Sequence, residues 1–187
     1  FGSAFHALLE RLSLPEAVRE RQSLELRPCL EELAAAVARQ FGVAERQQEL
    51  VNLAEKTLTL PVLAAAAREG AAVEWVQELP VVVDLDGVLV EGKIDLLLHS
   101  KAGLVVVDFK TDRVTDPADA ASRAALYRPQ AALYALLVSE AVGQPVKEVV
   151  LAFVRAGSEQ RLPVNAELLR EARDLVRAQA RVDRGEA

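Results

Sequence analysis

The stretch GKIDLLLHSKAGLVVVDFKTD, residues 92–112, decides how the chain is expected to fold. Two runs rich in Val, Ile and Leu, Val88–His99 and Leu104–Lys110, lie on either side of the turn sequence Ser100–Gly103. Apolar runs of this length around a glycine-containing turn are typical of two antiparallel strands. The stretch therefore predicts a β-hairpin.

Three charged residues, Asp95, Asp108 and Lys110, interrupt these otherwise apolar strands. A charge within an apolar strand is strongly unfavourable unless it is paired or bound to a metal ion. Asp-x-Lys or Gly-x-x-Asp alone is a common pattern that usually marks a surface salt bridge. The two patterns within one hairpin are more specific, and they call for a chemical explanation.

The register of the hairpin supplies a chemical explanation for these charges. If the turn is the four residues between His99 and Leu104, these two residues pair, and Asp95 lies directly opposite Asp108. Opposed residues share a sheet face with Cβ atoms about 4.5–5.5 Å apart, and Lys110 joins that face two residues further on. Two carboxylates this close repel unless a cation lies between them, and their oxygens suit Mg²⁺ or Mn²⁺. With the lysine beside them, the pattern predicts a site that hydrolyses a phosphodiester.

The remaining chain changes from helical to strand periodicity near residue 70. We expect an α/β fold in which a mixed sheet of four to five strands is flanked by helices and preceded by an N-terminal helical region. The expected helices are Phe1–Leu12, Pro28–Phe41, Ala44–Leu58, Pro129 to Gly143 and Asn165 or Ala166 to about Arg181, with a polar stretch over Thr111–Ser122. The expected strands outside the hairpin are Val73–Val83 and Lys147–Val154.

Composition excludes several classes of protein. None of the apolar runs approaches the roughly 18 residues that a membrane span needs, so no membrane association is expected. A single cysteine, Cys29, excludes a disulfide framework and an iron–sulfur cluster, and it favours a reducing cytoplasm. The chain begins at Phe1 without an initiator methionine, which suggests a fragment of a longer chain. The net charge of −6 disfavours DNA capture by bulk electrostatics, so another part of the protein is expected to deliver any DNA.

At this point the sequence resembles a known family. The motifs Gly92-x-x-Asp95 and Asp108-Phe109-Lys110 are similar to the core of the PD-(D/E)XK nucleases, in the RecB-like branch. Further motifs of that branch are present in the right order. Gly2-x-x-x-His6-x-x-x-Glu10 and Glu78-x-Pro80 lie upstream of the hairpin, and Gln130-x-x-x-Tyr134 lies downstream. The layout most resembles the C-terminal nuclease domain of AddA-type subunits of bacterial helicase–nucleases, which process double-strand breaks for recombination.

The resemblance implies a restriction-endonuclease-like core over residues 71–187, joined into one domain with a helical region, residues 1–70, that contributes the histidine-bearing helix. It implies a catalytic set of Asp95, Asp108 and Lys110. It assigns the metal ion to His6, Asp95, Asp108 and the backbone carbonyl of Phe109, and it gives Gln130, Tyr134 and Glu78 supporting or DNA-binding roles. Phe109 replaces the more usual tyrosine, which affects packing more than ligation.

The resemblance also implies an activity and partners. The chain is expected to be a Mg²⁺- or Mn²⁺-dependent deoxyribonuclease of the exonuclease type. Its expected partners are single-stranded DNA, helicase domains of the same chain and a second helicase–nuclease subunit, in the bacterial cytoplasm.

Other interpretations of the same residues stay open at this point. His6 alone would more often be a packed side chain, Gln130 a structural hydrogen-bonding group, and Glu78 an exposed strand residue. Two alternative functions of the whole chain also stay open. One is a catalytically inactive nuclease fold that acts as a scaffold or DNA-end-binding module, and the other is a hydrolase of other phosphate esters or nucleotides. Loss of a catalytic group would favour the inactive scaffold, and no such loss is seen in the motifs.

Overall fold

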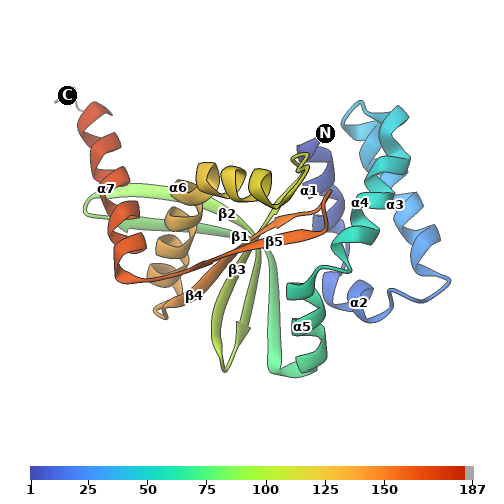
Figure 1. Cartoon of the computed structure of the whole chain (residues 1–187), viewed down its shortest axis with the longest axis horizontal. Coiled ribbons are helices and arrows are strands. Elements are labelled where there is room, and N and C mark those ends of the chain that lie inside the picture. Colours follow the sequence, from blue (N-terminus) through green and yellow to red (C-terminus); the bar gives the residue numbers. More distant parts are fainter. Residues whose placement is uncertain (184–187) are drawn as a thin grey trace. The chain divides into compact units, whose positions relative to one another are not determined.

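A computed structural model describes residues 1–183 of the chain, and Figure 1 labels its elements. The helices are α1 (Gly2–Arg11), α2 (Leu14–Arg19), α3 (Leu26–Gln40), η1 (Ala44–Arg46), α4 (Gln47–Thr57), α5 (Pro61–Glu69), η2 (Gly70–Ala72), α6 (Pro117–Val142) and α7 (Ala166–Asp183). The strands are β1 (Val73–Leu85), β2 (Val88–Ser100), β3 (Gly103–Lys110), β4 (Val146–Phe153) and β5 (Ser158–Pro163).

The chain divides into two compact units. The first contains residues 1–73 together with the segments 109–115 and 152–159, and the second contains the rest. The end of β3 and the end of β4 with its following turn therefore belong to the mainly helical unit. The division into a helical region over 1–70 and a core over 71–187 stays a prediction, and residues 184–187 lie outside the described part.

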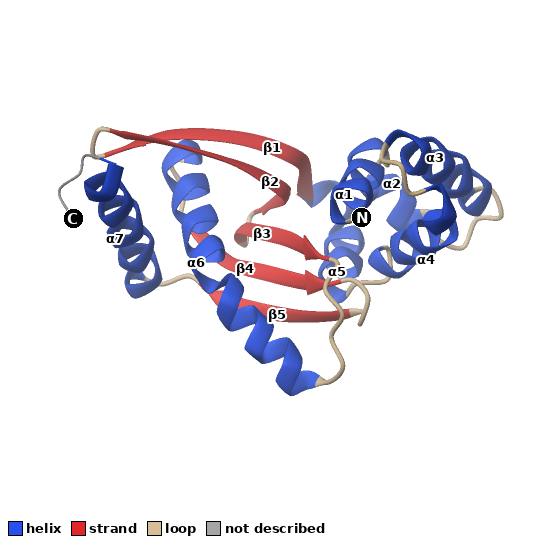
Figure 2. Cartoon of the chain, turned by 90° about the horizontal axis from the view of Figure 1, so that it is seen from above, coloured by secondary structure: helices blue, strands red, loops and turns tan. Residues whose placement is uncertain are grey.

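The five strands form one mixed sheet in the order β1-β2-β3-β4-β5, which confirms the expected α/β architecture. The hairpin register is confirmed as well, because His99 pairs with Leu104 and the ladder runs antiparallel to the pair Leu96 and Val107. Figure 2 shows β3 and β4 pointing the same way, as the intervening helix α6 requires. The β1–β2 turn places Asp86 and Gly87 at φ 56° and 84°, the positive values that a tight hairpin turn needs.

One helix boundary differs from the sequence-based expectation. Pro129 does not begin a helix but lies inside α6, which starts at Pro117 and takes in part of the stretch expected to be polar loop. Asp116 caps this helix, because its Oδ1 accepts hydrogen bonds from the backbone N–H groups of Ala118 and Asp119, both at 2.9 Å. Pro129 is exposed, so water can satisfy the carbonyl whose helical partner the proline removes.

Three short elements, α2, α5 and β5, are also absent from the expectation. The strand β5 carries mostly polar residues at the sheet edge, where neither alternation nor an apolar run marks a strand. The helix α2 has six residues, too few for a periodic apolar pattern to stand out.

Each unit has its own apolar packing. In the first unit, α1 packs against α3 and α4 and buries Phe5 and Leu8 completely. In the second unit, α6 packs along α7, and both contact β2 (Figure 2). Among the described residues, no single helix combines the length and apolar character of a membrane span, although the bent pair Ala44–Thr57 and Pro61–Ala72 does so by length and composition.

The cap at Asp116 gives a direct test of the α6 boundary. We expect Asp116→Ala to lower the free energy of unfolding by about 1 kcal/mol, because two backbone N–H groups lose their acceptor. Asp116→Asn keeps an acceptor and should retain most of that stability. Urea denaturation of the three proteins checks this, and an unchanged midpoint for Asp116→Ala would show that α6 starts elsewhere.

Candidate metal centre

The hairpin sets the central pair of acids. Beyond the pair Leu96 and Val107, the next residues on the two strands are Asp95 and Asp108, and the expectation that they lie directly opposite each other stays a prediction. Both carboxylates act electrostatically on Tyr134 of α6, so both lie close to that helix. The two acids thus occupy one region of the second unit.

Asp108 is the member whose charge most needs compensation. It is 4% exposed, and among the described residues it is the only buried acidic or basic side chain. Burial of a carboxylate is tolerated when hydrogen bonds, a cation or a metal ion compensate the charge. Its place at the end of a buried apolar strand, two residues before Lys110, is therefore a specific chemical feature of this chain.

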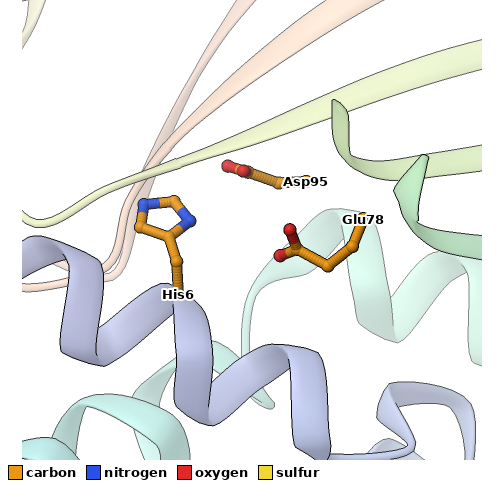
Figure 3. Close-up of side chains that lie close together, drawn as sticks. All are labelled: His6, Glu78 and Asp95. Carbon is orange, nitrogen blue, oxygen red and sulfur yellow. The ribbon is translucent and has the colours of Figure 1, made fainter. Parts of the chain in front are cut away.

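Glu78 of β1 supplies a further acid. A carboxylate oxygen of Glu78 and one of Asp95 lie within 4.8 Å of each other, and Figure 3 draws both side chains together with His6. The Glu78 carboxylate forms an ion pair with the Lys93 ammonium, with an N–O distance of 2.7 Å, and the Glu78 side chain is only 13% exposed. Asp108 is not a member of this closely spaced group, and the predicted pairing of its carboxylate with that of Asp95 stays a prediction.

The backbone at Glu78 is distorted. Its φ of 52° lies in the left-handed region although it is part of a strand and is not glycine. Such a conformation costs about 1–3 kcal/mol and is retained where the surroundings impose it, often at functional sites. The distortion sets the direction in which the Glu78 side chain leaves the strand.

The helix α6 brings an uncharged polar pair to the same region. The Gln130 amide donates a hydrogen bond to the Tyr134 hydroxyl at 3.0 Å, as their spacing of four residues on one helix face predicts. Burial raises the pKa of Tyr134, and the negative charge of Asp108 raises it further, so the phenol is neutral at pH 7. Gly92 leaves room for this helix, since a Cβ there would lie 3.1 Å from Leu137 and 3.5 Å from the Tyr134 ring.

The end of β3 and the start of α1 meet within the first unit. Phe109 is buried at 1% exposure, and Lys110, the last residue of β3, is half-buried. A Cβ at Gly2 would lie 3.4 Å from the Thr111 hydroxyl, so glycine allows α1 to start close to the residue after Lys110. His6 follows one turn later on α1 and packs edge-on against Phe5.

A network that the sequence did not suggest holds this junction. The Arg155 guanidinium donates to the Thr111 carbonyl at 2.6 Å and to the Glu49 carboxylate, while Arg46 donates to the same carboxylate at 2.7 Å. Both guanidinium groups lie over the Phe1 ring, at 3.6 Å for Arg46 and 5.2 Å for Arg155. These contacts connect Phe1, the residue just before the histidine-bearing helix, to the backbone just beyond Lys110.

Comparison with known proteins identifies the family. The family model of the PD-(D/E)XK nuclease superfamily matches residues 1–186. The chain belongs to this superfamily. Membership covers both units, so the helical first unit is part of the matched nuclease region.

Curated relatives of this PD-(D/E)XK chain share one name, that of an ATP-dependent helicase/nuclease component. The chain is 47% identical over 73 residues to the ATP-dependent helicase/nuclease subunit of this type from Desulforudis audaxviator, a match that covers 39% of this chain and 6% of the relative. It is 25% identical over 175 residues to the protein of the same name from Bacillus thuringiensis, covering 81% of this chain and 13% of the relative. The chain thus spans a small part of these relatives' length.

Among solved structures, the crystal structure of SSO0001 aligns with 72% of this chain and 69% of its own at 17% identity and a TM-score of 0.38. A TM-score at this level does not identify a shared fold. The strand order and the family match assign the fold.

The donor set fits a hard divalent ion. Glu78, Asp95 and Asp108 offer carboxylate oxygens within one unit, and such ligands suit Mg²⁺ or Mn²⁺. His6 and the Phe109 carbonyl belong to the first unit, and their part in the site stays a prediction. Lys93 is the residue of this region that sequence reasoning passed over, although its spacing of two residues from Asp95 places both on one face of β2.

The half-buried junction of the first unit should respond to pH. The Arg46 hydrogen bond, with Arg155 as a second donor, holds the pKa of Glu49 at about 2, below its ordinary 4.5. A lowered folded-state pKa gives stability that is fully present above about pH 4.5 and is lost as the pH falls towards 2. We therefore expect Glu49→Gln to be less stable than wild type at pH 7, with the difference shrinking below pH 4.5.

Urea unfolding of both proteins at a series of pH values measures this difference. Glu45→Gln removes an exposed carboxylate one turn earlier and serves as the control, with little change at any pH. A Glu49→Gln difference that stays constant between pH 7 and pH 2 would contradict the role assigned to the Glu49 carboxylate.

Proposed function

We propose that this chain is a divalent-metal-dependent DNA nuclease that hydrolyses phosphodiester bonds within a helicase–nuclease. The observation that carries the proposal is the presence of acids on three neighbouring strands. Glu78 and Asp95 offer oxygens within 4.8 Å of each other, and Asp95 and the buried Asp108 are the next residues beyond the pair Leu96 and Val107. This concentration of negative charge, followed by Lys110, fits an ion and a phosphate.

Five groups would hold the ion on this proposal: His6, Glu78, Asp95, Asp108 and the backbone carbonyl of Phe109. The position of α1 supports the inclusion of His6, since Gly2 lies against Thr111, three residues after Asp108. When bound, Mg²⁺ or Mn²⁺ supplies a Lewis acid that polarises a phosphate oxygen and lowers the pKa of water.

The chain's own groups do the remaining work. Lys110 places its ammonium at a phosphate oxygen, where it stabilises the charge that builds up as the bond to the leaving oxygen breaks, and it helps to orient the attacking water. The neutral Tyr134 phenol has one O–H to donate, because its oxygen already accepts from Gln130. That donor can orient a carboxylate or contact a DNA phosphate, and the Gln130 bond fixes its direction.

The substrate and partners follow from the relatives. Their shared name, which describes an ATP-dependent helicase/nuclease, supports DNA as the substrate and helicase domains in the same longer chain. We further propose a single strand at the site, exonuclease action, a cytoplasmic location and a second helicase–nuclease subunit. A net charge of −6 supports delivery of DNA by such a motor.

The competing possibility is a nuclease fold that has lost catalysis and serves as a scaffold. The sequence argues against a scaffold, because all four residues of the predicted catalytic and metal-binding motifs are present: His6, Asp95, Asp108 and Lys110. Glu78 adds a carboxylate that a pure scaffold would not need, in a strained backbone conformation.

Cleavage of a single-stranded oligonucleotide tests the proposal. We expect Asp108→Asn and Lys110→Ala each to lower the Mg²⁺-dependent rate by about a hundredfold or more, while circular dichroism shows both proteins folded. Lys101→Ala, at the exposed hairpin turn, is the matched control and should cleave like wild type. Equal cleavage by all four proteins, or none by the wild type with either Mg²⁺ or Mn²⁺, would contradict nuclease activity at this site.

A further inference from the structure

We propose that Lys93 is a positioning residue that changes partners: it holds Glu78 beside Asp95 before the metal ion binds, and it turns to a DNA phosphate afterwards. This inference rests on the metal site of the proposed function. It adds a residue that lies outside the motif positions and concerns only the second unit of the chain.

The ion pair between Lys93 and Glu78 is unequal. The Lys93 ammonium lies 2.7 Å from the Glu78 carboxylate, yet the lysine side chain is 53% exposed while that of Glu78 is 13% exposed. The carboxylate is therefore enclosed by the protein, whereas the lysine reaches it from the solvent side. A flexible four-carbon stem allows such an ammonium to leave without any movement of the backbone.

The position of the pair explains what it does before the ion binds. Lys93 and Asp95 are two residues apart on β2 and share a face, and Glu78 and Asp95 oxygens lie within 4.8 Å of each other. Two carboxylates at this spacing repel each other, and the ammonium offsets that repulsion. Lys93 thus allows Glu78 to keep its place near Asp95 in the free protein.

An ordinary surface salt bridge would not require the same geometry. Exposed pairs contribute little and impose nothing on the backbone. Here the Glu78 backbone is held at a φ of 52°, a conformation that persists only where its surroundings maintain it. The enclosed, strained carboxylate is the fixed partner, and Lys93 is the movable one.

Binding of a dication weakens the attraction between Lys93 and the carboxylates. The ion offsets most of the negative charge of the site, so the ammonium is held less strongly at Glu78. The lysine stays on the same face of the sheet, where the phosphates of a bound strand would offer it a new anionic partner. One ammonium would then serve the empty site and the DNA-bound site in turn.

Metal binding without DNA is the first test. We expect Lys93→Met to bind Mn²⁺ about two- to fivefold more tightly than wild type, because the ion no longer displaces an ammonium. Lys93→Arg should stay close to wild type, and Lys101→Met, which removes an exposed charge at the far turn of the hairpin, should not change the affinity. Isothermal titration calorimetry of the whole chain with Mn²⁺ measures all four.

DNA binding is the second test. With Mn²⁺ present and in a Lys110→Ala background that prevents cutting, Lys93→Met should weaken binding of a single-stranded oligonucleotide at every sequence tested. The slope of log affinity against log salt should fall by about 1, the signature of one lost phosphate contact. Lys93→Arg should restore the slope, and Lys101→Met should leave it unchanged. A residue that only supports the fold would not alter this slope.

The outcomes separate this inference from the proposed function. Weaker Mn²⁺ binding by Lys93→Met would overturn the proposed change of partners. It would mean that the Lys93 ammonium still supports Glu78 when the ion is bound. Unchanged Mn²⁺ affinity or an unchanged salt slope would overturn it as well, with the nuclease proposal intact. No Mn²⁺ binding by wild type would overturn the metal site itself and this inference with it.

Discussion

Like charges can occupy neighbouring positions of a sheet only if something neutralises them, and this constraint governs the second unit. The register of β2 and β3 pairs Leu96 with Val107, so Asp95 and Asp108 are the next residues on the two strands, and a slip of one residue would send one of them to the other face. The apolar residues of both strands fix that register, because a slip would expose side chains that are now buried. These side chains are Leu96, Leu98, Val106 and Val107. The hydrophobic core thereby brings together like charges that, on our proposal, a bound cation would compensate.

The first unit answers a different requirement, which is to hold the histidine-bearing helix at the end of β3. Apolar packing of α1 on α3 and α4 fixes its position only in part, since apolar contacts carry little directional information. The guanidinium of Arg155 adds direction, because it is planar and bonds the Thr111 carbonyl and the Glu49 carboxylate at once. The helix start and the strand end are thus fixed by the same hydrogen-bonded network.

The sequence predicted what depends on short-range pattern. Residues 92–112 indicated the hairpin and its register, and the spacing of Gln130 and Tyr134 indicated their contact. It failed at Pro129, because a proline on the exposed side of a helix resembles a helix start, and at β5, which has a polar edge-strand composition. The Glu78–Lys93 pair and the Arg155 network join residues from separate elements, and no local periodicity encodes such contacts. The distortion at Glu78 is likewise a product of tertiary structure, since nothing in the sequence around it favours a positive φ.

The acidic balance of the chain has a consequence for the order of events at the site. Carboxylates that gather to hold a cation also repel DNA, so an empty site disfavours the substrate that it is proposed to cut. On our proposal, binding of the ion reduces that repulsion and also frees one ammonium for the phosphate backbone. The strand and the ion would therefore favour each other's binding, as linkage requires of two ligands coupled through one set of groups. A domain with this property gains little from a basic surface and depends on delivery of the strand, which is the task that a helicase in the same longer chain would perform.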